Sequence, residues 1–599
     1  MTSETPKNGV GNAVEMSEAL AQIANKSQRL VNEFLQRQVN DGSLGMTDMT
    51  SINRAFMNVT RHLMADPGRL VEAQLRLWQD YLELWQKSTI AWLGQSSNPT
   101  ISPEPSDRRF RHEDWQQQFV FDYIKQSYLL TARWLHSTVT ETQGLDDKTR
   151  RKLDFYTRQF VDALAPTNFA VTNPEVLRTT LESGGENLLN GLNNLLDDLE
   201  RGKGKLHIRQ TDLDHFEPGR NIAITPGKVV YENELMQLIQ YQPSTEQVYR
   251  RPLLIVPPWI NKFYILDLRD KNSYIKWCVD QGLTVFVISW VNPDERLAEK
   301  NFEDYLSLGL LAAMDAVEQA TGEAKINMVG YCLGGTLLAA AAAYLASCED
   351  QRLQSCTFFT TMLDFAQPGE LEVFIDEEEL TALEQRMQQR GYLDGADMAT
   401  TFNMLRANDL IWSFFVNNYL LGKEPFPFDL LYWNSDSTRM PAAMHSFYLR
   451  NMYQNNLLKE PGGITLLGKP IDLSKLHLPV YSVAAFEDHI APWTSVYSGA
   501  QLLPGPVRFV LGGSGHIAGI INPPAAGKYH YWTCDAALDA DSEHWFQAAE
   551  RHEGSWWINW LDWLIAQAPE QVAARIPGDG KLAALEDAPG RYVRQRTGH

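Results

Sequence analysis

The sequence predicts an α/β fold with a mostly parallel sheet, preceded by a mainly helical domain. Three observations support this prediction. After residue 202, short runs of branched apolar residues alternate with helical stretches, a pattern typical of buried parallel strands joined by helices. One of these runs leads directly into a cysteine flanked by glycines. Before that point, apolar residues recur at helical spacing instead.

Length and charge limit the possible functions. A chain of 599 residues has room for one large domain and a substantial accessory region. Its composition, 44% hydrophobic and 21% charged, excludes global disorder. The 53 Lys and Arg residues against 74 Asp and Glu residues give a net charge of −21. Because phosphate binding needs a cationic surface, we expect no nucleic-acid partner.

Cysteine usage and hydropathy suggest a cytoplasmic location. The five cysteines are irregularly spaced and contain no CxxC pair, so the sequence supports neither a disulfide framework nor a zinc site. We expect a reducing compartment and no metal or other cofactor. The N-terminus lacks the apolar core of a signal peptide. The longest strongly apolar run, 337–346, is too short to span a bilayer, so we expect no transmembrane segment.

Residues 1–200 are predicted to form a helical domain. One apolar face extends from Leu20 to Leu35. A second helix is expected to begin at Asp66-Pro67, because Asp can cap a helix and Pro suits its first turn. A linker or surface loop rich in Ser and Pro follows at 96–106, and an aromatic-rich helix follows the loop. The apolar stripe of the second helix consists of Leu70, Val71, Leu75, Trp78, Leu82 and Trp85.

Residues 201–599 are predicted to form the catalytic α/β domain. The gap between the fourth parallel strand and the next is too long for a simple crossover, so an inserted cap is expected at about 365–475. The tryptophan-rich segment 555–563 is expected to pack a C-terminal helix on the sheet. The expected strands lie at 228–231, 236–241, 253–256, 283–288, 326–329, 356–359, 480–483 and 507–511.

The glycine-flanked cysteine resembles a nucleophile elbow. The segment GYCLG places Cys332 between Gly330 and Gly334, with a strand before it and an alanine-rich helix after it. This is the G-x-S-x-G pattern of α/β-hydrolases with cysteine in place of serine. The glycines allow close approach of strand and helix, and the helix N-terminus favours a thiolate. The backbone N–H of Leu333 is expected to be one oxyanion donor. A buried structural cysteine in a glycine-rich turn is the alternative.

An acid and a base follow in the chain order that α/β-hydrolases use. Asp488 and His516 each lie in a loop just after a predicted strand, where catalytic groups gather in α/β sheets. Glu487 is the alternative acid, and one residue of register separates it from Asp488. His489 is the alternative base, but it precedes the last strand, so we expect a supporting role for it.

The second oxyanion donor is expected in the loop after the first core strand. In the segment PPWIN the prolines have no N–H to donate, so the N–H of Ile260 is the candidate. Asp267, farther along the same segment, is expected to be structural.

Several separate motifs resemble the polyhydroxyalkanoate synthases, most closely their class I type. The resemblance covers most of the chain and includes helical segments near the N-terminus and the tail segment APGRYV. The motifs are GYCLGGTL around Cys332, VPPWINKFYILDL (256–268), LLYWNSDSTRMP (430–441), EDHIAPW (487–493) and GGSGHIAGIINPP (512–524).

The resemblance implies an activity and a set of partners. Enzymes of this family polymerise (R)-3-hydroxyacyl-CoA, typically 3-hydroxybutyryl-CoA, and release CoA. Their catalytic positions correspond to Cys332, Asp488 and His516, which favours Asp488 over Glu487. The resemblance also implies homodimers, a mobile lid within the cap, attachment to polyester granules, and an N-terminal domain that supports these functions.

Two other functions fit part of the pattern. A thioesterase or polyester hydrolase could use the same three residues and would release soluble acid. A non-catalytic granule-surface protein could retain the fold, although an intact triad argues against it. The sequence leaves open whether Asp488 orients His516 or acts directly on a hydroxyl, and it does not give the preferred acyl chain length.

Overall fold

The computed structural model describes residues 57, 67–93, 98–142, 144–538 and 541–596. The predicted helix between Leu20 and Leu35 lies outside these ranges. The described chain separates into two compact units. The first contains the residues up to Asp212 together with Phe402–Phe426, and the second contains Leu213–Thr401 and the chain from Pro427 onward.

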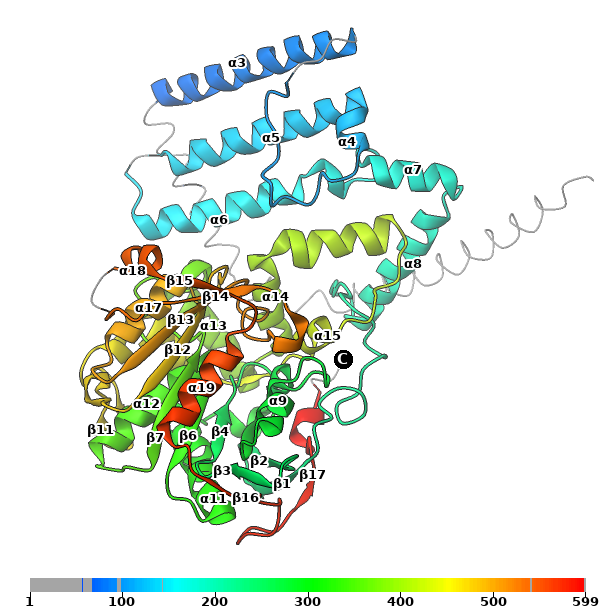
Figure 1. The fold of residues 1–599 in the computed structure, drawn as a ribbon. Helices are drawn as coiled ribbons and strands as arrows, with labels where there is room; N and C mark the ends of the chain where they lie inside the picture. The colour runs from blue at the N-terminus through cyan, green and yellow to red at the C-terminus, as the bar shows by residue number, and fades with distance from the viewer. Residues whose placement is uncertain (1–56, 58–66, 94–97, 143, 539–540, 597–599) are drawn as a thin grey trace, which may run out of the picture. The chain divides into compact units, whose positions relative to one another are not determined.

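The first unit is helical, and α3, α5 and α6 lie side by side in Figure 1. The helix predicted at Asp66-Pro67 begins at Pro67. Asp146 caps α6 by accepting a hydrogen bond from the N–H of Thr149 at 2.9 Å. The helices are α3 (Pro67–Trp92), α4 (Asp114–Gln117), α5 (Phe119–Thr140), α6 (Asp147–Ala163), α7 (Pro174–Glu182) and α8 (Glu186–Arg201), with π-helical turns η6 (Asn408–Trp412) and η7 (Phe415–Leu420).

The segment 402–426 joins this helical unit, whereas the sequence analysis assigned it to the cap. Its turn η7 packs on α8, where a Cβ at Gly191 would lie 1.8 Å from the carbonyl oxygen of Tyr419. The fully buried Asp198 of α8 accepts hydrogen bonds from Arg209 at 2.6 Å and from the Tyr419 hydroxyl at 2.7 Å. Contacts between segments so far apart in the chain produce no periodic pattern in the sequence. The boundaries of the two units therefore differ from the predicted domain boundary at 200/201 and the predicted cap at 365–475.

The apolar stripe of α3 is exposed. Its buried side instead carries Leu84, and the hydroxyl of Tyr81 on α3 contacts Thr131 of α5 at 2.8 Å. Trp78, at the centre of the stripe, keeps 68% of its surface exposed. The exposed members of the stripe are Val71, Leu75, Trp78, Leu82 and Trp85.

The second unit contains a mixed sheet of eleven strands in the order β15-β14-β13-β12-β7-β6-β4-β5-β2-β1-β17. The pairs between β5 and β13 are parallel, and antiparallel strands complete both edges. The strands are β1 (Gly227–Glu232), β2 (Met236–Tyr241), β4 (Leu253–Val256), β5 (Val285–Trp290), β6 (Ile326–Tyr331), β7 (Leu353–Phe359), β12 (Val480–Ala485), β13 (Val507–Gly512), β14 (His530–Thr533), β15 (Glu550–Glu553) and β17 (Glu586–Asp587).

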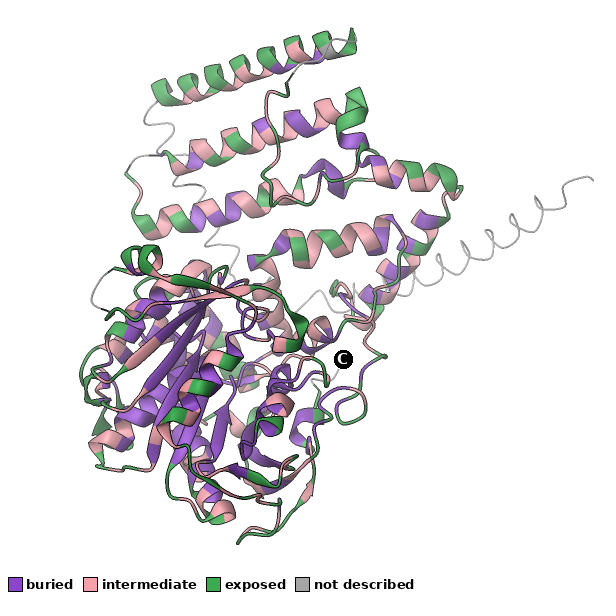
Figure 2. Ribbon diagram, in the orientation of Figure 1, coloured by how far each residue is buried: buried purple, intermediate pink, exposed green. Residues whose placement is uncertain are grey.

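All eight predicted strands are present, and six of them are apolar runs that the sheet buries. Figure 2 shows these central strands as buried. The sequence analysis missed the edge strands β14, β15 and β17. These strands are short and polar, so their pairing depends on the neighbouring strand and not on hydrophobic pattern.

Helices cover the sheet and form the inserted segment. The predicted C-terminal tryptophan helix is confirmed as α19, whose Trp557 and Trp560 contact Trp277 of α9. No helix of the described ranges has the length and apolarity needed to cross a membrane. The main helices are α9 (Tyr274–Asp280), α11 (Ala312–Thr321), α12 (Leu333–Ser347), α13 (Glu377–Arg390), α14 (Gly395–Leu405), α15 (Asp429–Ser435), α16 (Ala442–Tyr448), α17 (Trp493–Gln501), α18 (Ser542–Ala548) and α19 (Trp557–Gln567).

Candidate active site

Cys332 lies at the sharp turn between β6 and α12. Its φ of 51° is in the left-handed region, a conformation that costs a non-glycine residue free energy and is common at functional sites. Two contacts hold the turn: the N–H of Cys332 donates to the carbonyl of Phe359 at 2.9 Å, and its own carbonyl accepts from the N–H of Gly335 at 2.9 Å. The side chain is half-buried, and the helix N-terminus follows it directly.

The glycines of the turn are required by close backbone approach. A Cβ at Gly334 would lie 2.1 Å from the carbonyl oxygen of Val256, at the end of β4. A Cβ at Gly330 would lie 2.4 Å from the Cα of Gly335. Glycine therefore allows β6, β4 and the first turn of α12 to meet, as the sequence pattern predicted.

Asp488 and His516 form the expected acid–base pair. They follow β12 and β13, which are neighbouring parallel strands. His516 Nδ1 lies 2.6 Å from Asp488 Oδ2, and both side chains are buried. The other oxygen, Oδ1, accepts hydrogen bonds from the backbone N–H groups of Ile490 at 2.8 Å and Ala491 at 2.9 Å. Glu487 is exposed, so the structure pairs Asp488 with the histidine.

Asp488 and Cys332 both act on the imidazole of His516. Burial lowers the pKa of His516, but the interactions with Asp488 and Cys332 outweigh this effect and raise the pKa from 6.5 to about 10. The raised pKa favours the protonated imidazole at neutral pH. The structure thus brings Cys332, His516 and Asp488 together, with His516 hydrogen-bonded to Asp488.

The loop that carries His516 is fixed by large aromatic side chains. Tyr331 donates from its hydroxyl to the carbonyl of His516 at 3.1 Å, and its ring stacks on the imidazole at 5.7 Å. The indole N–H groups of Trp556 and Trp557 each donate at 2.8 Å, to the carbonyls of Gly519 and Ile520. Sequence analysis missed the role of Tyr331, although it is the residue just before the nucleophile.

The two predicted oxyanion donors lie at the ends of adjoining segments. Leu333 is the first residue of α12, and Ile260 lies buried in the loop after β4. A Cβ at Gly334 would lie 2.7 Å from the carbonyl oxygen of Pro257, which belongs to this loop. The first turn of α12 therefore touches the loop. Trp290 fixes the loop by donating from its indole N–H to the same carbonyl at 2.9 Å.

The two residues predicted to have supporting roles have different surroundings. His489 follows Asp488 directly and is half-buried. Asp267 is buried and accepts hydrogen bonds from the hydroxyls of Thr225 at 2.5 Å and Ser273 at 2.7 Å. Burial raises the pKa of Asp267. Its bonds join the segments that carry Thr225 and Ser273, which is the contact pattern of a structural residue.

Two tyrosines from the inserted segment lie close together and interact with the nucleophile. Tyr448 and Tyr453 both interact electrostatically with Cys332, and their ring centroids lie 5.7 Å apart. Burial raises the pKa of each hydroxyl well above its usual range. No local pattern predicts them, because they are 116 and 121 positions after Cys332 in a segment without regular period.

The described ranges contain no group of three or more His, Cys, Asp or Glu side chains that could hold a metal ion.

Comparison with known proteins shows which family the chain resembles. A model described as the N-terminus of poly-beta-hydroxybutyrate polymerase matches residues 106–278, and a model of the alpha/beta hydrolase fold matches residues 258–523. A poly(3-hydroxyalkanoate) polymerase of Methylorubrum extorquens is 50% identical over 98% of this chain and 97% of its own length.

The chain belongs to the poly(3-hydroxyalkanoate) polymerase family. The poly(3-hydroxyalkanoate) polymerase subunit of Cupriavidus necator is 43% identical over 89% of each chain. The polymerase family therefore extends over both units of the structure. Its hydrolase-fold part, 258–523, contains Cys332, Asp488 and His516.

Proposed function

We propose that the protein polymerises (R)-3-hydroxyacyl-CoA into a polyester and releases CoA, with Cys332 as the covalent nucleophile. The observation that carries this proposal is the grouping of Cys332, at the elbow, with the hydrogen-bonded pair of His516 and Asp488 in a polymerase-family chain. Short acyl chains such as 3-hydroxybutyryl are the proposed substrates, because the sequence most resembles the class I type.

In the first step the Cys332 thiolate attacks the thioester carbonyl of the substrate. The carbon–sulfur bond to CoA breaks, and the departing CoA thiolate takes the proton of the His516 imidazolium. One thioester replaces another, so the exchange is nearly balanced in free energy. The raised pKa of His516 supports this order of events, because the imidazole carries a proton for the leaving group at neutral pH.

In the second step the acyl group moves to the hydroxyl at the end of the growing chain. After acylation the negative charge of Cys332 is gone, and with it two of the causes that raise the pKa of His516. The neutral imidazole can then take the hydroxyl proton as the oxygen attacks the acyl carbon. The ester forms, and Cys332 leaves as the thiolate beside a protonated His516, as at the start.

Asp488 is proposed to orient His516. One of its oxygens binds the imidazole, and the other is occupied by two backbone N–H groups. The N–H groups of Leu333 and Ile260 are proposed to stabilise the oxyanion in both steps, since the helix N-terminus and the adjoining loop meet beside Cys332. CoA thioester is the substrate in this scheme, and no cofactor takes part.

Attachment to a polyester surface and formation of a homodimer are part of the proposal. The exposed apolar stripe of α3 supports both, because a stripe of this kind favours an apolar surface or a partner chain. The proposed location is the cytoplasmic surface of polyester granules.

The direct test is incubation of the purified protein with (R)-3-hydroxybutyryl-CoA. Thiol release accompanied by insoluble polyester is the expected result. Thiol release with free 3-hydroxybutyrate would make the protein a thioesterase that uses the same triad. If thiol is not released from this or longer acyl-CoA substrates, the catalytic proposal is wrong and a granule-surface role becomes the better explanation.

A further inference from the structure

The helix that brings two tyrosines to Cys332 changes its winding. It is α-helical from Ala442 to Tyr448 and π-helical in η8, from Leu449 to Gln454. In an α-helix, residues five apart point ~140° away from each other. The wider π-turn brings such residues closer to one side, and π-turns are frequent at functional sites. It thereby allows Tyr448 and Tyr453 to share one face, with their rings 5.7 Å apart.

The inner face of this helix packs on the segments that surround the nucleophile. The ring of Tyr448 lies 5.7 Å from that of Trp259, in the loop after β4. Trp259 directly precedes the oxyanion candidate Ile260. The ring of Tyr453 lies 5.0 Å from that of Phe365, just after β7. The pair of tyrosine rings, here called the tyrosine wall, therefore packs on the loops after β4 and β7, the two strands on either side of β6.

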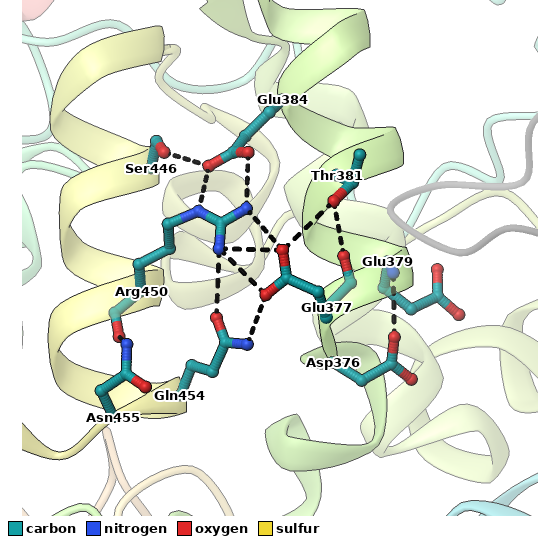
Figure 3. A network of polar contacts seen from close by, with 9 residues as sticks. All are labelled: Asp376, Glu377, Glu379, Thr381, Glu384, Ser446, Arg450, Gln454 and Asn455. Atoms are coloured by element: carbon teal, nitrogen blue, oxygen red, sulfur yellow. Dashed lines mark hydrogen bonds and ion pairs between the residues drawn. The ribbon is translucent and has the colours of Figure 1, made fainter.

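The outer face carries three polar residues at intervals of four: Ser446, Arg450 and Gln454. Together they bind two carboxylates of α13, as Figure 3 shows: Ser446 binds Glu384, Gln454 binds Glu377, and Arg450 binds both. Arg450 makes a bidentate contact with Glu384, through Nε at 2.7 Å and a terminal nitrogen at 2.8 Å. Its other terminal nitrogen binds Glu377 at 3.1 Å.

We propose that Arg450 is a positioning residue: by joining α13 to the outer face of η8, it holds Tyr448 and Tyr453 against Cys332. This inference deepens the proposed function, on which it rests. The two tyrosine rings then limit the directions from which water and acyl groups reach the thiolate. Arg450 itself touches none of the reacting atoms.

The contribution of Arg450 is geometric more than energetic. Glu377 is 65% exposed, and exposed ion pairs contribute little to stability because water screens them. The planar guanidinium nevertheless fixes the distance and angle between two helices, which a lysine could not do equally well. Loss of Arg450 should therefore leave the fold in place and loosen the tyrosine wall.

The first test measures the reactivity of Cys332 and needs no substrate. Iodoacetamide is added at pH 7 to the full-length wild type and to Arg450→Gln, Glu377→Gln and Arg352→Gln, and labelling of each cysteine is followed by peptide mass spectrometry. Arg352 is the matched control, because it also binds two carboxylates, those of Asp350 and Asp315. The exposed Cys348 is the internal reference.

The expected result is a rise of about fivefold in the labelling rate of Cys332 in Arg450→Gln, a smaller rise in Glu377→Gln and none in the control. Labelling of Cys348 should be unchanged throughout. An unchanged rate at Cys332 in Arg450→Gln would overturn the proposal. Since this measurement involves no acyl-CoA, its outcome is independent of whether the wild type makes polymer.

The second test separates positioning from a merely structural role. With kcat normalised to the measured concentration of active sites, Arg450→Gln should lower kcat about fivefold and leave KM nearly unchanged. Arg450→Lys should recover part of this loss. Tyr453→Phe removes the hydroxyl but keeps the ring. The effects of Arg450→Gln and Tyr453→Phe should be less than additive in the double variant. Fully additive effects, or an equal loss in Arg352→Gln, would contradict a role through the tyrosine wall.

Discussion

Asp488 and His516 are 28 residues apart in the chain, and their Oδ2 and Nδ1 atoms lie 2.6 Å apart. The pair forms because β12 and β13 are adjacent parallel strands, so the loops after them begin at the same edge of the sheet. Asp488 is fixed in turn by two backbone N–H groups. Asp488 thus orients the imidazole of His516 and helps to stabilise its protonated form.

Asp488→Asn should reduce kcat by about 10²–10⁴-fold, because the imidazole loses the charge that stabilises its protonated form. The fold should be retained, since asparagine can still accept the two backbone hydrogen bonds through its side-chain oxygen. Steady-state kinetics with 3-hydroxybutyryl-CoA check this. Glu487→Gln is the matched control, and a comparable loss in that variant would point to the wrong acid.

The raised pKa of His516 predicts a pH-dependent contribution to stability. Its folded-state pKa of about 10 is above the unfolded value of 6.5, so the folded protein binds the proton more tightly. The stabilisation is therefore fully present below about pH 6.5 and is lost as pH rises through about 10. Relative to His516→Gln, the free energy of unfolding of the wild type should fall by at least ~1 kcal/mol between these limits.

Urea denaturation at several pH values measures this difference. In a Cys332→Ala background the pH window should be narrower, because the contribution of Cys332 to the pKa of His516 is absent. A difference between wild type and His516→Gln that does not change with pH would show that the imidazole titrates normally.

Cys332→Ala should abolish CoA release, a loss of more than about 10³-fold, while the free energy of unfolding changes by less than ~1 kcal/mol. The stability change is small because the side chain is only half-buried. Calorimetry and a thiol-release assay check the two parts. Persistent CoA release from this variant would rule out Cys332 as the nucleophile and with it both the synthase and the thioesterase proposals.

Trp556→Phe should lower kcat while leaving KM nearly unchanged, because the loop that carries His516 loses the hydrogen bond to Gly519. Trp560→Phe is the matched control: its indole N–H donates to the Thr357 hydroxyl, on β7, at 3.0 Å. Both variants lose one buried hydrogen bond and should be destabilised by roughly 1–3 kcal/mol. Equal kinetic losses in the two variants would show that overall stability is responsible.

Trp78→Glu combined with Leu75→Lys should weaken attachment to polyester particles, since both residues belong to the exposed stripe of α3. Co-sedimentation with granules and light scattering measure attachment and oligomeric state. Arg133→Gln is the matched control, because Arg133 of α5 forms an ion pair with Asp80 of α3 without belonging to the apolar stripe. Unchanged attachment and an unchanged oligomeric state would exclude the stripe from both roles.

The sequence by itself determined the parallel sheet and the location of the nucleophile. The six apolar strand runs and the GYCLG turn are local signals, because continuous burial and a sharp strand-to-helix turn each demand particular residue types within a few positions. Chain order then predicted Asp488 and His516, and the 2.6 Å contact between them is consistent with that order. Local pattern left Glu487 open as the acid.

Only the tertiary structure decided the remaining features. The grouping of 402–426 with the N-terminal helices depends on the approach of Gly191 to Tyr419. The exposure of the α3 stripe depends on which side Leu84 and Tyr81 bury. Tyr448 packs on Trp259 across more than a hundred positions of sequence. Each of these is a contact between distant segments, and a contact of this kind produces no periodicity in the sequence of either partner.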